Sequence, residues 1–481
     1  MQPSPPRRCL SPVAPGDIDV AGLPSLRIVR MRLPRLLATL AVAAASLPAQ
    51  TAPSIPFEKF TLPNGLEVIL HVDRSVPIVA VNSWYKVGSG DEKPGRTGFA
   101  HLYEHIMFMG SKHVPVGKFD QWLEAAGASN NGTTNGDRTN YYETGPSNAL
   151  KLMLWLDADR MGNLLPTMDQ AKLDLQRDVV KNERRQNTEN QPYGLTFETL
   201  SPVLFPAEHP YSWTTIGSMA DLSAASLEDV KEFFRLYYAP NNATIAIAGD
   251  FEPDSVKRWV RDYFGGIPRN TAQLVRPTVV STARTADSVL VLEDRVQLPQ
   301  LSWNFRTVRA FHDDDAALDA AAEILGGGKS SRLYKSLVYE RQIAQDVAVY
   351  HASQKYDGYL RISSTAKPDQ HPRLLAAAFD SVLRQLATDG PTDRELQQVK
   401  NGMRANMLDA LSSVLGKTDR LSYYNYLVGT PDYLAQDLAR YDRLTRADIQ
   451  RVVQQYLLKP KVVLTVVPQG KKELAVMGGA N

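Results

Sequence analysis

Cysteine is nearly absent from this sequence of 481 residues, in which Cys9 is the only thiol. A single cysteine excludes a disulfide framework, and we expect the mature protein to lack the segment around Cys9, which excludes a cysteine nucleophile as well. The charges are nearly balanced, with a formal net charge of +2, and the sequence has no basic run and no basic patch interleaved with aromatic residues. We therefore expect no nucleic-acid partner.

The sequence also has no apolar run of comfortable membrane-spanning length, since Leu36–Leu47 is too short. A short basic stretch that begins at Met31 precedes this run, and small residues follow it, which is the pattern of a secretory signal peptide. We predict that residues 1–50 are an upstream extension plus a signal peptide, with the start at Met31. The mature chain is then exported, to the periplasm or outside the cell, with no stable membrane span; an uncleaved anchor is the alternative.

The most informative pattern lies in the stretch Gly98–His105, which contains His101, Glu104 and His105. Residues at positions i, i+3 and i+4 are neighbours on the surface of a helix. Two neutral histidines one turn apart can bind one tetrahedral Zn²⁺, and the carboxylate between them can act on a water at the metal. The order H-x-x-E-H is that of the inverzincins. On the pattern alone, the alternative is a solvated helix face with two incidental histidines.

The surroundings of this pattern resemble the pitrilysin/insulinase family of zinc peptidases, which includes the mitochondrial processing peptidase and many bacterial relatives. The family motif G-x-A-H-x-x-E-H, followed by F-x-G-[ST], matches at every fixed position from Gly98 to Ser111. The resemblance implies a zinc metalloendopeptidase with one Zn²⁺ per chain, bound in part by His101 and His105. Zinc lowers the pKa of its bound water to about 7, and Glu104 is then the general base for attack on a peptide bond.

A catalytic zinc needs a third protein ligand, which in this family is a glutamate on a later helix. The segment Gln176–Glu183 resembles the family element E-R-x-V-x-x-E, and Glu183 lies 183 − 105 = 78 positions after His105. We therefore expect Glu183 to be the third metal ligand. Many relatives have a second glutamate where this chain has Gln176, which we expect to be a second-shell residue that contributes no charge.

A further family element lies between the two ligand segments. The stretch Asn131–Thr134, with the following Asp137–Tyr142, resembles the run N-A-x-T-x-x-D-x-T-x-Y. In the family this run is an edge strand near the metal, and it pairs with an extended peptide substrate. We expect Asn131, Gly132 and Thr133 to bind substrate. Without the family resemblance, the Asn-Gly pairs are simply turn residues beside a strand.

The chain also contains an internal repeat, which suggests a duplication. Asp73, which precedes a strand with Trp84, is matched by Asp294 before Trp303, an offset of 294 − 73 = 221. We predict an N-terminal metal-binding peptidase domain over residues 51–270, a linker over 271–287 and a homologous C-terminal domain over 288–481 without metal ligands. The expected fold class is α+β, in which each domain has a mixed β-sheet with helices packed mainly on one face.

One family feature is missing from the second half. Active members use an arginine and a tyrosine, spaced as L-R-x-x-x-x-L-x-Y in a non-metal domain, and the aligned positions here are Val338 and Gln345. Arg341 or Tyr350 are possible substitutes, although both are out of register. We therefore expect this chain to be the metal-bearing subunit of a heterodimer whose partner supplies the Arg/Tyr pair, with a homodimer as the second choice.

Two other functions stay open at the level of sequence. A non-catalytic structural subunit of the same family is the first, although such relatives usually lose the ligands that are present here. A peptide-binding or zinc-carrying protein associated with export is the second, and it predicts metal binding without turnover. Metal content and hydrolysis measured together distinguish these alternatives.

Overall fold

The computed structural model describes residues 53–279 and 283–477. The predicted upstream extension, its start at Met31 and the signal peptide lie outside the described residues. Within the described part of the chain, no helix is both long and apolar enough to cross a membrane.

The first sheet is mixed and has the strand order β1-β2-β6-β3-β5-β4. Only β2 and β6 are parallel, and the other neighbouring strands are antiparallel. Its strands are β1 (Glu58–Thr61), β2 (Glu67–Val72), β3 (Ile78–Tyr85), β4 (Ser129–Thr134), β5 (Thr139–Pro146) and β6 (Ala243–Gly249).

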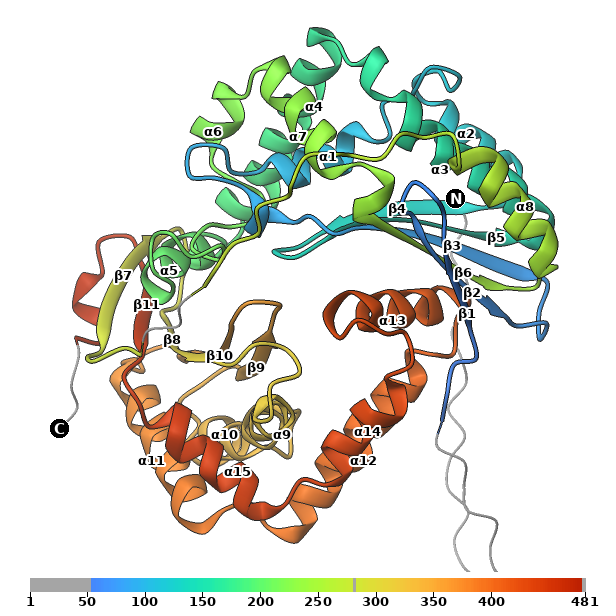
Figure 1. The fold of residues 1–481 in the computed structure, drawn as a ribbon. Helices are drawn as coiled ribbons and strands as arrows, with labels where there is room; N and C mark the ends of the chain where they lie inside the picture. The colour runs from blue at the N-terminus through green and yellow to red at the C-terminus, as the bar shows by residue number, and fades with distance from the viewer. Residues whose placement is uncertain (1–52, 280–282, 478–481) are drawn as a thin grey trace, which may run out of the picture. The chain divides into compact units, whose positions relative to one another are not determined.

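Figure 1 shows a layer of helices against one face of this sheet. The helices of this half are α1 (Phe99–Ile106), α2 (Lys118–Ala125), α3 (Leu150–Asn163), α4 (Gln170–Arg184), α5 (Thr196–Leu204), α6 (Met219–Ala224), α7 (Leu227–Tyr237) and α8 (Pro253–Phe264). Side chains alternate between the two faces of a strand. On β3, Val81 and Tyr85 accordingly enter the large apolar core beneath the helix layer.

The second sheet has the order β7-β11-β8-β10-β9, and only β7 and β11 are parallel. Its strands are β7 (Ser288–Asp294), β8 (Gln300–Thr307), β9 (Ala348–Ser353), β10 (Gly358–Thr365) and β11 (Val462–Pro468). Its helices are α9 (Asp315–Gly326), α10 (Arg332–Tyr334), α11 (Arg373–Asp389), α12 (Asp393–Asp409), α13 (Val414–Leu427), α14 (Leu434–Asp442) and α15 (Arg446–Val452). A second apolar core joins this sheet to its helices.

The two sheets share one topology. The order β2-β6-β3-β5-β4 in the first corresponds strand by strand to β7-β11-β8-β10-β9 in the second, with the parallel pair in the same place. Two mixed sheets with helices on them confirm the predicted α+β fold class. By this correspondence α9 is the counterpart of α1, and the edge strand β9 is the counterpart of β4.

One helix of each half packs on the sheet of the other half. Helix α13 packs on β3 and β6, where Asn82 donates a hydrogen bond of 3.4 Å to Thr418. Helix α5 packs on β7, β8 and β11, where Leu204 and Phe205 meet Val462 in a shared apolar cluster. The two halves are therefore held together by buried contacts in both directions.

Candidate metal centre

Helix α1 begins at a backbone turn that two residues hold in place. Gly98 has φ +90°, and a Cβ there would lie 2.9 Å from the carbonyl oxygen of Ile216, so glycine is required. The buried carboxylate of Glu92 accepts hydrogen bonds from the backbone N–H of Gly98 (2.9 Å) and Ala100 (2.7 Å). These are donors that a helix leaves unpaired at its first turn. Burial raises the pKa of the Glu92 carboxyl well above its usual range, and the two backbone hydrogen bonds act against that rise.

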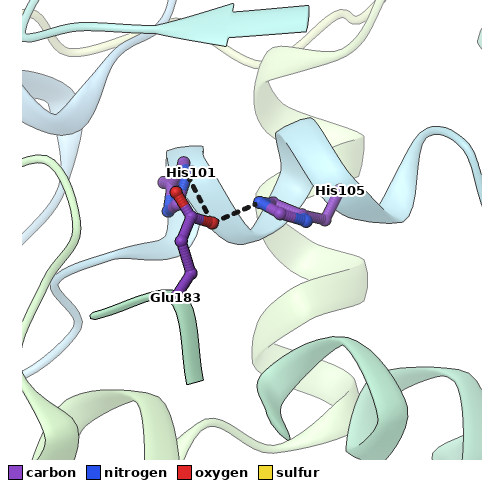
Figure 2. Close-up of side chains that lie close together, drawn as sticks. All are labelled: His101, His105 and Glu183. Atoms are coloured by element: carbon purple, nitrogen blue, oxygen red, sulfur yellow. Dashed lines mark ion pairs between the residues drawn. The ribbon is translucent and has the colours of Figure 1, made fainter. Parts of the chain in front are cut away.

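The three predicted ligands converge in the structure. Glu183 Oε2 lies 3.7 Å from Nε2 of His101 and 3.2 Å from Nε2 of His105. Figure 2 shows both imidazoles on one helix, pointing toward the carboxylate from α4. The two rings are 4.9 Å apart and nearly perpendicular, at 89°. His105 and Glu183, which are 78 positions apart in the sequence, therefore lie side by side in the structure.

This donor set fits a zinc ion. Metal–ligand bonds of about 2.0–2.1 Å in a tetrahedron place neighbouring ligand atoms roughly 3.4 Å apart, and the two measured separations lie on either side of this value. Burial lowers the pKa of His101 to about 4, with a further contribution from His105, so that its imidazole is neutral and its nitrogen lone pair is available. Nδ1 of His101 is buried and has no hydrogen-bond partner among the described residues.

Glu104 lies on the same helix, and β4 fixes its position. The hydroxyl of Thr134 donates a hydrogen bond of 2.6 Å to Oε2 of Glu104. Gly132 lies against the same side chain, because a Cβ at Gly132 would be 2.9 Å from Cγ of Glu104. Burial raises the pKa of the Glu104 carboxyl, against the effect of the Thr134 hydrogen bond. A carboxylate with a raised pKa beside a metal site suits general-base chemistry.

The two ligand helices are tied together next to the ligands. Arg184, which follows Glu183, is buried and donates a hydrogen bond of 2.8 Å to the carbonyl oxygen of Gly217. Gly217 packs so closely on Gly98 that a Cβ would lie 2.4 Å from the Gly98 Cα. After Arg184 the chain passes into a π-helical turn, Arg185–Glu189 (η4), and such turns are frequent at functional sites.

The predicted substrate-binding residues lie on β4, which is an edge strand as expected and pairs only with β5 in the described sheet. Asn131 is exposed, and its side chain accepts a hydrogen bond of 2.8 Å from the backbone N–H of Gly132. The side chain of Thr133 bonds to Asn140 (2.5 Å) and to Arg138 (2.5 Å) within the hairpin. Substrate binding by Asn131, Gly132 and Thr133 stays a prediction.

The structure gives Gln176 a different partner from the one expected. Its side chain is buried on α4 and donates a hydrogen bond to the thioether sulfur of Met109. No hydrogen bond from Gln176 to His101, His105 or Glu183 is present among the described contacts. A second-shell role for Gln176 stays a prediction, and its contact with Met109 is a packing contact within the helix layer.

Sequence reasoning missed the roles of two residues that shape the centre, Glu92 and Thr134. Thr134 is the threonine of the N-A-x-T run, but that motif does not indicate its contact with Glu104, which depends on how β4 packs on α1. Glu92 precedes Gly98 by six residues, so that its capping role depends on the turn between them.

Comparison with known proteins defines the class of this fold and centre. Residues 67–206, which contain all four residues of the centre, match the family model of insulinase (peptidase family M16). Residues 224–403 match the model of the peptidase M16 inactive domain. The chain is 30% identical over 406 residues to the zinc protease PqqE of Helicobacter pylori, covering 83% of this chain and 90% of that protein.

Other proteins that the chain resembles are also peptidases or peptidase subunits by name. A probable mitochondrial-processing peptidase subunit beta of Arabidopsis thaliana is 25% identical over 422 residues, which are 85% of this chain and 77% of that protein. The crystal structure of a protease from Helicobacter pylori superposes with a TM-score of 0.79 at 27% identity, covering 86% of this chain and all of that one. The first half of the periplasmic protease PqqL from Escherichia coli shares the fold, with a TM-score of 0.71 at 17% identity over 88% of this chain and 94% of that one.

The chain therefore belongs to peptidase family M16, the insulinase family. Several of its relatives are named zinc proteases, so zinc is the metal of this family.

Proposed function

We propose that this chain is a zinc metalloendopeptidase that binds one catalytic zinc through His101, His105 and Glu183. The observation that carries this proposal is the convergence of these three side chains beside Glu104. All three ligand atoms lie within 4.8 Å of one another. The names of the relatives as zinc proteases agree with it.

The chemistry then divides between the metal and the chain. Zinc, when bound, makes water acidic enough to attack at neutral pH and polarises the scissile carbonyl. His101, His105 and Glu183 hold the metal on the face of α1. Glu104 takes the proton of the attacking water at its carboxylate and delivers it to the leaving amine. Thr134 orients that carboxylate through its hydroxyl.

The proposed substrate is a peptide or an unfolded segment that pairs along β4. An edge strand offers unpaired backbone groups, and an extended peptide can add to them with little demand on its side chains. Asn131, Gly132 and Thr133 would contact this peptide within reach of Glu104, since a Cβ at Gly132 would lie 2.9 Å from Cγ of that side chain.

A heterodimer is the proposed assembly, because the positions of the family Arg/Tyr pair hold Val338 and Gln345. Val338 lies in a π-helical segment, Lys335–Glu340 (η6), and packs against the second core. Of the two possible substitutes, Arg341 is exposed at the end of that segment, and Tyr350 lies on β9 with its hydroxyl 3.5 Å from that of Tyr359. A homodimer is the alternative assembly.

We further propose the domain division and the location predicted from the sequence. No helix or strand lies in the described residues of the linker 271–287, which supports domains over 51–270 and 288–481. Export to the periplasm or outside the cell agrees with one solved relative, PqqL of Escherichia coli, which is a periplasmic protease by name.

A second candidate is a non-catalytic or peptide-binding subunit of the same family. It is favoured by the missing Arg/Tyr pair and by the match of residues 224–403 to a domain described as inactive. This candidate predicts zinc binding without hydrolysis, even when a partner is present.

One experiment separates these possibilities. The zinc-loaded chain is assayed on a quenched fluorescent peptide library, alone and with a homologous subunit that carries the L-R-x-x-x-x-L-x-Y run. The proposal predicts weak hydrolysis alone and a rate at least ten times higher with the partner. Full activity of the chain alone would contradict the heterodimer, and zinc binding with no hydrolysis in either case would contradict the enzyme.

A further inference from the structure

A second group of metal-binding side chains lies in the C-terminal half, at the position that corresponds to the first centre. Asp315 and Asp319 are four residues apart on α9, the counterpart of α1, and His351 lies on β9, the counterpart of β4. Nδ1 of His351 is 2.8 Å from Asp319 Oδ1 and 3.9 Å from Asp315 Oδ1. The three ligand atoms lie within 4.8 Å of one another.

Each of these side chains is held at its far end. Arg440 donates a hydrogen bond of 2.6 Å to Oδ2 of Asp315, and the hydroxyl of Tyr441 donates one of 2.7 Å to Oδ2 of Asp319. Nε2 of His351 lies 3.0 Å from the hydroxyl of Thr307. Metal ligands are typically oriented in this way, by a hydrogen bond at the atom that does not bind the metal.

One inward-facing atom, by contrast, lacks a hydrogen-bond partner in the part of the chain that the structure describes. Oδ1 of Asp315 has no hydrogen-bond partner among the described residues, although Asp315 is only 4% exposed. A buried oxygen without a donor is unfavourable, and more so when it is charged. Nδ1 of His351 and Oδ1 of Asp319 lie 2.8 Å apart and form a hydrogen bond with each other, so that Oδ1 of Asp315 is the atom of the described cluster left without a partner. A cation bound between the three side chains would give that oxygen a partner.

The charges of the cluster also favour a bound cation, because its carboxylates outnumber the arginines of the described chain that pair with them. Two carboxylates face the space between α9 and β9, and Arg440 compensates one of them from α14. The imidazole and carboxylate donors together suit a divalent transition metal, and zinc has a high affinity for such a mixed set. The sequence predicts no metal ligands in this domain and one Zn²⁺ per chain, because α9 carries no histidine and His351 is 32 positions after Asp319; a metal bound at this group departs from that prediction.

We propose that Asp315, Asp319 and His351 bind a second, structural divalent transition metal, for which Zn²⁺ is the probe. The metal joins α9 to the edge strand β9, and it has no part in hydrolysis. This inference is independent of the proposed peptidase function, because it is tested by the metal content of full-length variants, including one without the first centre, and not by hydrolysis.

The test uses the full chain, stripped with a chelator, reloaded with Zn²⁺ and passed through a desalting column before elemental analysis. We expect two zinc ions in the wild type and one in each of His351→Gln and Asp319→Asn. The double variant His101→Ala/His105→Ala, which removes the first centre, should retain one. Asp313→Asn is the matched control, since Asp313 is an exposed carboxylate beside the cluster, and it should retain two.

A second readout keeps the test valid if one variant folds poorly. Co²⁺ bound to the His101→Ala/His105→Ala chain should give visible absorption bands, and adding either His351→Gln or Asp319→Asn should remove them. One zinc in the wild type and none in the double variant would overturn the proposal. In that case the cluster is a network of hydrogen bonds around His351, and the first centre remains intact.

Discussion

The hydroxyl of Thr134 donates a hydrogen bond of 2.6 Å to Oε2 of Glu104, and so joins the edge strand β4 to the helix of the metal centre. This contact fixes one carboxylate oxygen of Glu104 and leaves the other oxygen available to accept a proton from the attacking water. The strand that we propose to bind the peptide therefore also orients the proposed general base. If both proposals hold, this one contact couples substrate binding to catalysis.

Replacing Thr134 with valine removes the hydroxyl and keeps the shape of the side chain. We expect kcat for peptide hydrolysis to fall up to about tenfold, since one hydrogen bond contributes about 0.5–1.5 kcal/mol. KM and zinc content should change little. Thr134→Ser keeps the hydroxyl and should retain nearly full activity; equal losses in both variants would show that the hydrogen bond does not matter.

Gly132 should not tolerate a side chain. A Cβ at this position would lie 2.9 Å from Cγ of Glu104 and 3.3 Å from Cδ1 of Tyr141, so that Glu104 must move. We expect Gly132→Ala to lower kcat by about 100-fold, as a displacement near 1 Å can do, while zinc remains bound. Gly402→Ala, which has open space around it on α12, is the control and should leave the rate unchanged.

Glu92 should stabilise the start of the metal helix. Glu92→Ala removes the acceptor for the backbone N–H groups of Gly98 and Ala100, and the free energy of unfolding should fall by about 1–2 kcal/mol. Zinc affinity should fall as well, because His101 lies in the first turn of α1. Urea unfolding and zinc titration measure the two effects. The exposed Glu208→Ala serves as control, and an equal effect there would refute the capping role.

The ion pairs of Glu67 should make the free energy of unfolding of this protein depend on pH. Burial alone raises the pKa of Glu67, but hydrogen bonds from Lys59 and Lys86 outweigh it and lower this pKa to about 2, compared with 4.5 for a free glutamate. Because the folded-state pKa is the lower one, the stabilisation is fully present above pH 4.5 and is lost as the pH falls toward 2. It amounts to about 3 kcal/mol, of which about 2 are lost between roughly pH 6 and pH 3.

The variant Glu67→Gln isolates this contribution from that of other carboxylates. Its free energy of unfolding in urea should be lower than that of the wild type at pH 6, and the difference should narrow as the pH falls. A difference that is constant with pH would show that the two lysines do not hold the charge of Glu67.

The local parts of this molecule were predictable from the sequence. The apolar stretches Leu66–Leu70 and Val76–Trp84 indicate strands and correspond to β2 (Glu67–Val72) and β3 (Ile78–Tyr85). Both strands are buried on their two faces, because helices or strands of the protein cover each side of the sheet. His101 and His105 share a helix face, since their spacing is that of one helical turn. The approach of Glu183 followed from the family motif, not from the physics of the segment.

The contacts between distant elements were not predictable. The pairing of Asn82 with Thr418 depends on α13 crossing to the first sheet, and no local pattern in either segment indicates that crossing. Asp319 and His351 meet for a similar reason, because β9 packs along α9. Such contacts depend on the relative placement of whole elements, and sequence periodicity reports only which face of an element is buried.

The most direct test of the central claim is the variant Glu104→Gln, measured for zinc content and for peptide hydrolysis in the same preparation. The amide keeps the size of the side chain and its contact with Thr134, but it cannot take a proton from water. We predict zinc content equal to that of the wild type and a loss of hydrolysis of at least about 100-fold. Hydrolysis at the wild-type rate by Glu104→Gln would contradict the assignment of this centre as the catalytic site.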